Sequence, residues 1–124
     1  MAGERVLIVD DDRVAGAVYR QALELEGLQV DSVSNGFEAL RRIEVLRPDL
    51  IVLDMMMPVM DGWQVLEELR FRKAPPPVVV VSVSANIKQL TAAGVAACFS
   101  KPFGLARFRE TCVGILRGPW RAPS

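Results

Sequence analysis

Short apolar segments alternate along the chain with longer segments of helical period, and this alternation most constrains the possible fold. Five apolar segments occur, at residues 6–9, 28–33, 50–53, 78–83 and 96–99. Strands that are apolar on both faces are typical of a parallel sheet buried between two layers of helices. The pattern therefore predicts one α/β domain in which a helix follows each strand.

The segments between the strands carry apolar residues at helical spacing. Gly27 is expected to end the first helix, and Pro48 the second, because the residue before a proline disfavours helical geometry. The first helix is expected to bury a face formed by Val14, Val18, Ala22 and Leu25. The later inward faces are expected to be formed by Ala39, Leu40, Ile43 and Leu46, by Leu66 and Leu69, and by Leu105, Phe108, Cys112 and Ile115. Residues 86–93 predict only a short helix.

The composition excludes several kinds of site. The 124 residues contain no histidine and only two cysteines, Cys98 and Cys112, which excludes histidine bases, a disulfide framework and the usual zinc spacings. The net charge of zero gives no sign of direct nucleic-acid binding. Residues 101–124 carry a surplus of four positive charges, which is typical of a solvated helix face. Because no apolar run is long enough for a membrane span or signal peptide, we expect a cytoplasmic protein with no membrane contact.

Polar residues follow four of the predicted strands. They are Asp10 and Asp11 after the first, Asp54 after the third, Ser84 after the fourth and Lys101 after the fifth. In open parallel sheets the site lies at the carboxyl ends of the strands, so these side chains converge if their strands are neighbours. Three carboxylates repel one another unless a hard divalent cation such as Mg²⁺ lies among their oxygens. Lys101 and Ser84 add a positive charge and a hydroxyl group, which suit a phosphoryl group.

Four pieces of sequence, in this order and spacing, carry a resemblance to a known family. They are VLIVDDD, DLIVLDMMMPVMDGW, VVVVSVSA and FSKPF. Over residues 5–117 the chain resembles the receiver domain of two-component response regulators, the CheY-like family. The resemblance implies a flavodoxin-like (βα)5 three-layer sandwich, whose five-stranded parallel sheet has the order 2-1-3-4-5. It also implies a receiver domain at residues 1–118, followed by a tail or the start of a linker at 119–124.

The resemblance implies a role for each member of the acidic cluster. Asp54 corresponds to the phosphate acceptor. Asp10 and Asp11 correspond to the acidic pair that holds Mg²⁺ or Mn²⁺ together with Asp54 and the backbone carbonyl of Met56. Asp12 is expected to have a structural role instead, because its position before the first helix favours an N-cap.

The resemblance also implies how the phosphorylated state is recognised. Ser84 corresponds to the switch hydroxyl, and it is preferred over Ser82 because Ser82 lies inside the strand and Ala85 follows Ser84 as in the family. Lys101 corresponds to the residue that pairs with the phosphoryl group. The peptide bond between Lys101 and Pro102 is implied to be cis, a geometry that is inexpensive only before proline.

The function implied is that of a signalling domain and not of an enzyme. The expected phosphodonor is a sensor histidine kinase or a phosphotransfer protein, whose phosphohistidine passes its phosphoryl group to Asp54. The domain is expected to assist its own phosphorylation and slow dephosphorylation. The output partner is not identified by the sequence, and a homodimer linked to phosphorylation is a further expectation.

Two departures from the family pattern concern switching and lifetime. Lys101 lies 17 positions after Ser84, about one helical turn fewer than expected, which indicates a short or irregular fourth helix. The aromatic switch position, three residues before the lysine, is Cys98. Met56 and Asn86 are not strong bases for activating water, so the phosphoaspartate is expected to hydrolyse slowly.

Two other functions are compatible with the same residues. One is a receiver-like interaction module that works without phosphorylation, as the short fourth helix and Cys98 suggest. The other is a phosphatase similar to the haloacid-dehalogenase-like enzymes, in which Asp10 of the sequence Asp10-Asp11-Asp12 is the nucleophile. Such enzymes need a further acidic metal motif downstream, and the chain has no aspartate after Asp61.

Overall fold

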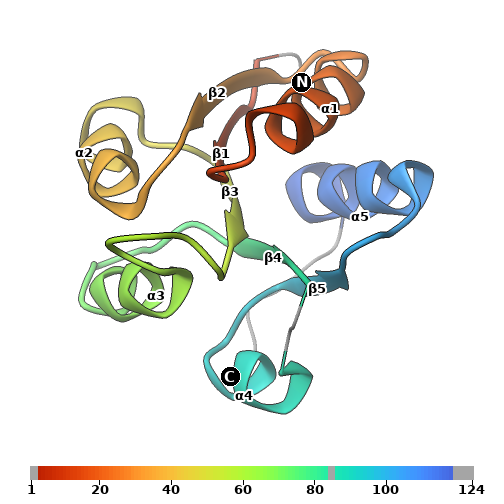
Figure 1. Ribbon diagram of the computed structural model, residues 1–124. Helices are drawn as coiled ribbons and strands as arrows, with labels where there is room; N and C mark the ends of the chain where they lie inside the picture. Colours follow the sequence, from red (N-terminus) through yellow and green to blue (C-terminus); the bar gives the residue numbers. More distant parts are fainter. Residues whose placement is uncertain (1–2, 84–85, 119–124) are drawn as a thin grey trace.

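A computed structural model describes residues 3–83 and 86–118, which form a five-stranded parallel sheet with helices on both faces (Figure 1). The sheet order is β2-β1-β3-β4-β5, which confirms the predicted order. The strands are β1 (Arg5–Val9), β2 (Gln29–Val33), β3 (Leu50–Asp54), β4 (Val78–Ser82) and β5 (Ala97–Ser100). Each neighbouring pair is parallel, so all five carboxyl ends lie at one edge of the sheet.

The helices form two layers, one on each face of the sheet (Figure 1). Helices α1 (Arg13–Glu24) and α5 (Leu105–Arg117) cover one face. Helices α2 (Gly36–Leu46), α3 (Gly62–Arg70) and α4 (Ile87–Ala92) cover the other. The predicted three-layer sandwich is therefore confirmed, and the six residues of α4 confirm that the fourth helix is short.

The strand residues alternate between two hydrophobic cores. In β1, Leu7 and Val9 pack on the α2–α3 side, whereas Val6 and Ile8 pack on the α1–α5 side, and all four are fully buried. Strands β3 and β4 are buried along their whole length. The thiol of Cys112 lies in the α1–α5 core, and burial raises its pKa to about 12, as expected for a packing residue.

The predicted inward face of the first helix is confirmed only at Ala22 and is wrong at its other three positions. Val14 and Leu25 are 75% and 74% exposed, and the buried residues of α1 are Gly16, Tyr19, Ala22 and Leu23. Asp12 caps the helix as expected, because its Oδ1 accepts hydrogen bonds from the amides of Val14 and Ala15 at 3.0 and 3.2 Å. The contact with the sheet then decides which face is buried, because the bulky Tyr19 and Leu23 bury more apolar area than the valines would.

The basic C-terminal end is less solvated than the charge pattern predicts. Arg109 forms an ion pair with Glu26 at 3.4 Å. Arg117 donates two hydrogen bonds to Glu4, from Nε at 2.7 Å and from Nη2 at 3.0 Å, and a third to the carbonyl of Glu26. These contacts tie the end of α5 to the chain before β1, and the hydrogen bond from Arg117 lowers the pKa of Glu4 to about 2.

The stability contributed by this pair depends on pH. The pKa of Glu4 is about 2 in the folded protein and 4.5 in its ordinary range, so the stabilisation is complete above pH 4.5 and is lost as the pH falls toward 2. In urea unfolding, Glu4→Gln should therefore be less stable than the wild type at neutral pH, and the difference should shrink as the pH falls through this window. Glu24→Gln, which removes an exposed pair on α1, is the control with little effect. If the stability difference between Glu4→Gln and the wild type does not change with pH, Glu4 does not have the lowered pKa described above.

Candidate functional site

The parallel register brings three carboxylates together at the carboxyl edge of the sheet. Asp54 is the last residue of β3, and Asp10 and Asp11 directly follow its neighbour β1. One oxygen atom from each of the three lies within 4.8 Å of the others. Asp10 and Asp54 are each only 4% exposed, whereas Asp11 is exposed. An all-oxygen donor set that is open on one side suits a hard divalent cation that keeps several waters.

Lys101 supplies the positive charge of the site. Its Nζ lies 3.0 Å from Oδ2 of Asp10 and 3.8 Å from Oδ2 of Asp54. The lysine amide donates to the carbonyl of Ser82, and the Lys101–Pro102 peptide bond is cis, as the sequence predicts. Burial lowers the pKa of Lys101, but the hydrogen bond and charge of Asp10 outweigh it and raise the pKa overall. The ammonium group therefore stays charged beside the carboxylates.

Asp54 has an unusual electrostatic environment. Burial is the main reason that its pKa rises from 3.8 to about 6, and the negative charge of Asp10 adds to the rise. The amide of Met56, which donates to Oδ1 of Asp54 at 3.2 Å, and the charge of Lys101 oppose it. Asp54 is therefore a carboxylate at neutral pH, but one whose ionisation destabilises the fold.

The loop after Asp54 depends on a close approach that only glycine permits. The amide of Gly62 donates to the carbonyl of Met55 at 3.1 Å. A Cβ atom on Gly62 would lie 2.6 Å from Cα of Met55 and 2.9 Å from the carbonyl oxygen of Asp54. The glycine of the MDGW segment thus holds the start of α3 against the backbone of the predicted acceptor. The sequence pattern alone contained no signal for this contact.

Val59 lies in a strained turn of the same loop. Its φ of 71° is in the left-handed region, and the amide of Met60 bonds to the carbonyl of Pro58 at 2.8 Å, which makes a three-residue γ-turn. A β-branched residue is rare in this conformation. The side chain is 82% exposed, so no packing compensates for the strain.

Relief of this strain should stabilise the protein. Val59→Gly and Val59→Asn should each raise the free energy of unfolding by about 1 kcal/mol, because both residues tolerate positive φ. Denaturant unfolding measures the change. Val45→Asn, at an equally exposed helical position, is the control, and it should not stabilise. A loss of stability in both Val59 variants would contradict the turn geometry.

The remaining predicted residues are the two candidate switch hydroxyls, Ser84 and Ser82, and the aromatic switch position at Cys98. Ser84, with Ala85, lies outside the described residues, whereas Ser82 is fully buried at the end of β4, inside the strand as expected. Cys98 faces the α2–α3 core and Phe99 the opposite one. Phe99 therefore does not occupy the aromatic switch position, and the described residues place no aromatic ring there.

An aromatic cluster beside the lysine was not predicted from the sequence. Phe99 and Phe103, which flank Lys101 and Pro102, pack with Phe108 and with Tyr19 of α1. The ring centroids in contact lie 5.2 to 5.7 Å apart, which is the normal range for stabilising aromatic pairs. The sequence contained one signal for the position of Tyr19. Tyr19 and Leu23 are four residues apart, which places them on one face of the first helix, but Val14 and Val18 form a second apolar face on the same helix.

Comparison with known proteins agrees with this fold. The family model described as "Response regulator receiver domain" matches residues 6–112. The chain belongs to this family: it is a receiver domain of two-component response regulators. Receiver domains are signalling domains that act with histidine kinases and output domains.

Particular relatives support the assignment. The chain is 38% identical over 120 residues to "Transcriptional regulatory protein PrrA" of Mycobacterium leprae. The aligned residues cover 94% of this chain and 52% of the relative. It is 35% identical over 116 residues to "Response regulator MprA" of Mycobacterium ulcerans, with coverages of 91% and 50%. The chain therefore spans about half the length of these curated relatives.

Solved structures show the same fold. A CheY-like response regulator receiver domain protein from Methanospirillum hungatei superposes with a TM-score of 0.84 at 28% identity, over 93% of this chain and 94% of that one. A signal receiver domain from Bermanella marisrubri gives 0.82 at 28% identity, over 93% and 99%. Within the part of the chain that the structure describes, no helix is long and apolar enough to cross a membrane.

Proposed function

We propose that Asp54 accepts a phosphoryl group from a phosphohistidine on a sensor histidine kinase or a phosphotransfer protein. The observation that carries the proposal is the position of the Asp54 carboxylate, which is buried at the sheet edge between Asp10 and the ammonium group of Lys101. Residues 1–118 are proposed as the receiver unit, and residues 119–124 as its tail or the start of a linker.

The geometry supports a separate role for each of these residues during phosphoryl transfer. An oxygen of Asp54 attacks phosphorus, the new P–O bond forms, and the electrons of the breaking P–N bond return to the histidine nitrogen. The Met56 amide orients the carboxylate through Oδ1. Lys101 reaches both Asp10 and Asp54 and is placed to pair with a phosphoryl oxygen as charge develops. Ser84 is proposed as the hydroxyl that recognises the phosphorylated state.

The acidic cluster fits a divalent cation. Mg²⁺ or Mn²⁺, held by Asp10, Asp11, Asp54 and the Met56 carbonyl, would neutralise the negative charge of the carboxylates and of the phosphoryl oxygens. Lys101 pairs with two of the three carboxylates, those of Asp10 and Asp54, so a cation would add positive charge to a site with three acidic groups. The donor set of this chain therefore supports a metal-dependent reaction.

The surroundings of the site support a long-lived phosphoaspartate. The side chain of Met56 is 56% exposed and apolar, so it cannot take a proton from water. The amide oxygen of Asn86 is already used, because it accepts a hydrogen bond from the Gln89 amide and caps α4. Neither residue is a base for hydrolysis, so the phosphorylated form should not decay within seconds.

An apolar surface beside Lys101 is suited to the donor. A groove of about 500 Å³ runs between α1 and the segment after β5, and its lining includes Val18, Tyr19, Val83, Lys101 and Leu105. The side chains of Val18 and Val83 in this lining are 39% and 65% exposed. Because Lys101 lines the groove and its Nζ lies 3.8 Å from Asp54, we propose that the phosphodonor binds against this groove.

The phosphatase alternative lacks the further acidic metal motif that such enzymes need. Within residues 3–83 and 86–118, no second acidic cluster accompanies the first. The interaction module that works without phosphorylation retains support from the short α4 and from Cys98.

Incubation with acetyl phosphate and Mg²⁺, followed by peptide mass mapping, separates the three functions. Label on Asp54 supports the phosphoacceptor, no label supports the interaction module, and turnover through Asp10 supports the phosphatase. Asp54→Asn should abolish labelling, with Asp31→Asn as a surface control that leaves it unchanged.

A second pair of variants tests the roles within the sequence of three aspartates. Asp11→Ala should abolish labelling and the rise in melting temperature with Mg²⁺. Asp12→Ala should cost about 1 kcal/mol of stability, because the helix cap is lost, and should leave labelling intact.

A further inference from the structure

Lys101 needs support along its side chain as well as at its ammonium group. Its Nζ lies 3.0 Å from Oδ2 of Asp10 and 3.8 Å from Oδ2 of Asp54, so only the contact with Asp10 is at hydrogen-bond distance. The stem of a lysine is a flexible chain of four carbons, and one hydrogen bond at its end does not fix the torsion angles along it. The residues that border the stem therefore decide how steadily the ammonium group faces Asp54.

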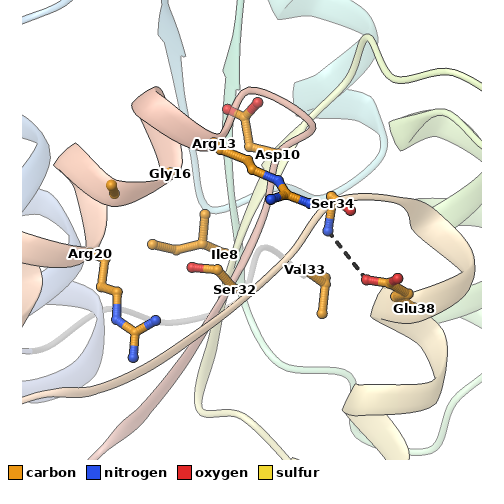
Figure 2. A pocket seen from close by; sticks show the side chains of 10 residues that line it. Ile8, Asp10, Arg13, Gly16, Arg20, Ser32, Val33, Ser34 and Glu38 are labelled. Atoms are coloured by element: carbon orange, nitrogen blue, oxygen red, sulfur yellow. Dashed lines mark hydrogen bonds between the residues drawn. The ribbon is translucent and has the colours of Figure 1, made fainter.

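The stem of Lys101 is bordered on the side of the apolar groove. The groove of about 500 Å³ is lined by Lys101 together with Tyr19 and Phe103. A second cavity, of about 400 Å³, opens between α1 and the ends of β1 and β2, and its lining includes Asp10 (Figure 2). Lys101 does not belong to the lining of that second cavity. The lysine therefore approaches Asp10 from the groove, where aromatic residues are its neighbours.

Tyr19 is firmly held in this aromatic wall. The residue is only 5% exposed, although it lines the groove. Its ring stacks on Phe103, with the centroids 5.5 Å apart and the planes at 23°, and it packs on Phe108 at 5.2 Å. Contacts of this kind have preferred geometries, so two of them restrict the orientation of the Tyr19 ring.

Tyr19 lies near both ends of the Lys101 side chain. At the backbone end, it stacks on Phe103, which is only two residues after the lysine. At the other end, the phenol group and the ammonium group are close enough for each to affect the pKa of the other. Burial is the main reason that the pKa of Tyr19 is raised, and the charge of Lys101 opposes the rise. The phenol is therefore neutral at neutral pH, and its ring is placed alongside the lysine.

We propose that Tyr19 is a positioning residue for phosphoryl transfer to Asp54. Its ring confines the side chain of Lys101 and keeps the ammonium group directed at the two buried carboxylates. This inference rests on the proposed function of Asp54, in which Lys101 pairs with a phosphoryl oxygen. Leu23, one turn later on the same face of α1, is fully buried but does not line the groove, so it is expected to contribute packing alone.

NMR of the lysine side chains tests the confinement without phosphorylation. The chain contains three lysines, and Lys73 and Lys88 are exposed, so they serve as internal references in the full chain labelled with ¹³C-lysine. In metal-free buffer, the two ε protons of Lys101 should have separate chemical shifts in the wild type and in Tyr19→Phe, which keeps the ring. In Tyr19→Leu the two shifts should coincide, as they should in Lys73 and Lys88. Tyr19→Met takes the place of Tyr19→Leu if the latter does not fold.

The rate at which acetyl phosphate and Mg²⁺ label Asp54 tests the consequence for transfer. Tyr19→Leu should lower this rate about tenfold, because a misplaced ammonium group stabilises the transferred phosphoryl group less well. Tyr19→Phe should stay within about threefold of the wild type. Leu23→Val, which removes a methylene group from the same core, should lower the melting temperature and leave the rate unchanged.

A double-mutant cycle shows whether Tyr19 acts through Lys101. Lys101→Ala should slow the labelling, and Tyr19→Leu added to it should cause no further loss. Three results would overturn the proposal: separate ε-proton shifts for Lys101 in Tyr19→Leu, a full loss from Tyr19→Leu in the Lys101→Ala background, and equal slowing by Leu23→Val. If the wild type itself is not labelled on Asp54, the proposed function fails, and the lysine spectra still show whether Tyr19 holds Lys101.

Discussion

Asp54→Asn should make the metal-free protein more stable at neutral pH while it abolishes phosphorylation. The pKa of Asp54 is raised from 3.8 to about 6, chiefly by burial, so the folded state holds a proton that the unfolded chain releases. The native state is therefore favoured below pH 4, and this advantage is lost as the pH rises toward 6. Above pH 6 the ionised carboxylate destabilises the fold, and an uncharged asparagine of the same shape removes that penalty.

The free energy of unfolding of Asp54→Asn should exceed that of the wild type by about 2 kcal/mol at pH 7.5. This is less than the free energy that corresponds to the whole pKa difference, because solvent and Lys101 relax around the charge. Urea unfolding in EDTA at pH 4 and pH 7.5 measures it: the two proteins should be nearly equal at pH 4 and diverge at pH 7.5. Added Mg²⁺ should stabilise the wild type and not the variant, because only the wild type retains all three carboxylates. A variant less stable than the wild type at pH 7.5 would contradict the burial of the charge.

Gly62→Ala should be among the most damaging single-methyl changes in this chain. The added Cβ would lie 2.6 Å from Cα of Met55 and 2.9 Å from the Asp54 carbonyl, and backbone atoms cannot move aside as a flexible side chain does. We expect a loss of about 3 kcal/mol, at the upper end for overpacking. The displaced backbone carries Asp54, so phosphorylation by acetyl phosphate should also slow.

Gly114→Ala is the matched control for this variant. Gly114 lies within α5, and nothing lies within 4 Å of the position that a methyl group would take there. The same chemical change should therefore stabilise the protein by about 1 kcal/mol through helix propensity. Denaturant unfolding of both variants should give effects of opposite sign. A neutral Gly62→Ala would show that the loop after β3 is not held as closely as the structure indicates.

The elements themselves were predictable because their signals are local. The continuous apolar runs predict buried parallel strands, and all five strands occur within two residues of the predicted bounds. The cap at Asp12 and the short α4 follow from neighbouring residues in the same way. The strand order and the cis peptide at Lys101 came from the family resemblance and not from periodicity, and both are confirmed.

The face of α1 shows where local pattern fails. Its sequence offers two apolar faces, and the periodicity cannot rank them, because the ranking depends on what each face meets. Tyr19 packs against Phe103 and Phe108, which come from the far end of the chain. The two valines that were assigned to the core, Val14 and Val18, instead remain exposed, and Val18 lines the groove proposed for the phosphodonor.

The layered α/β fold and the set of polar residues at the strand ends follow from the sequence alone, because both depend on spacing along one chain. Packing in three dimensions was needed to establish that Lys101 contacts Asp10 more closely than Asp54, that the pKa of Asp54 is raised, and that Gly62 has no room for a methyl group. The cavity between α1 and the ends of β1 and β2 likewise exists only once α1 lies across the sheet (Figure 2). These properties depend on distances and burial between segments that are remote in sequence, and no local pattern encodes them.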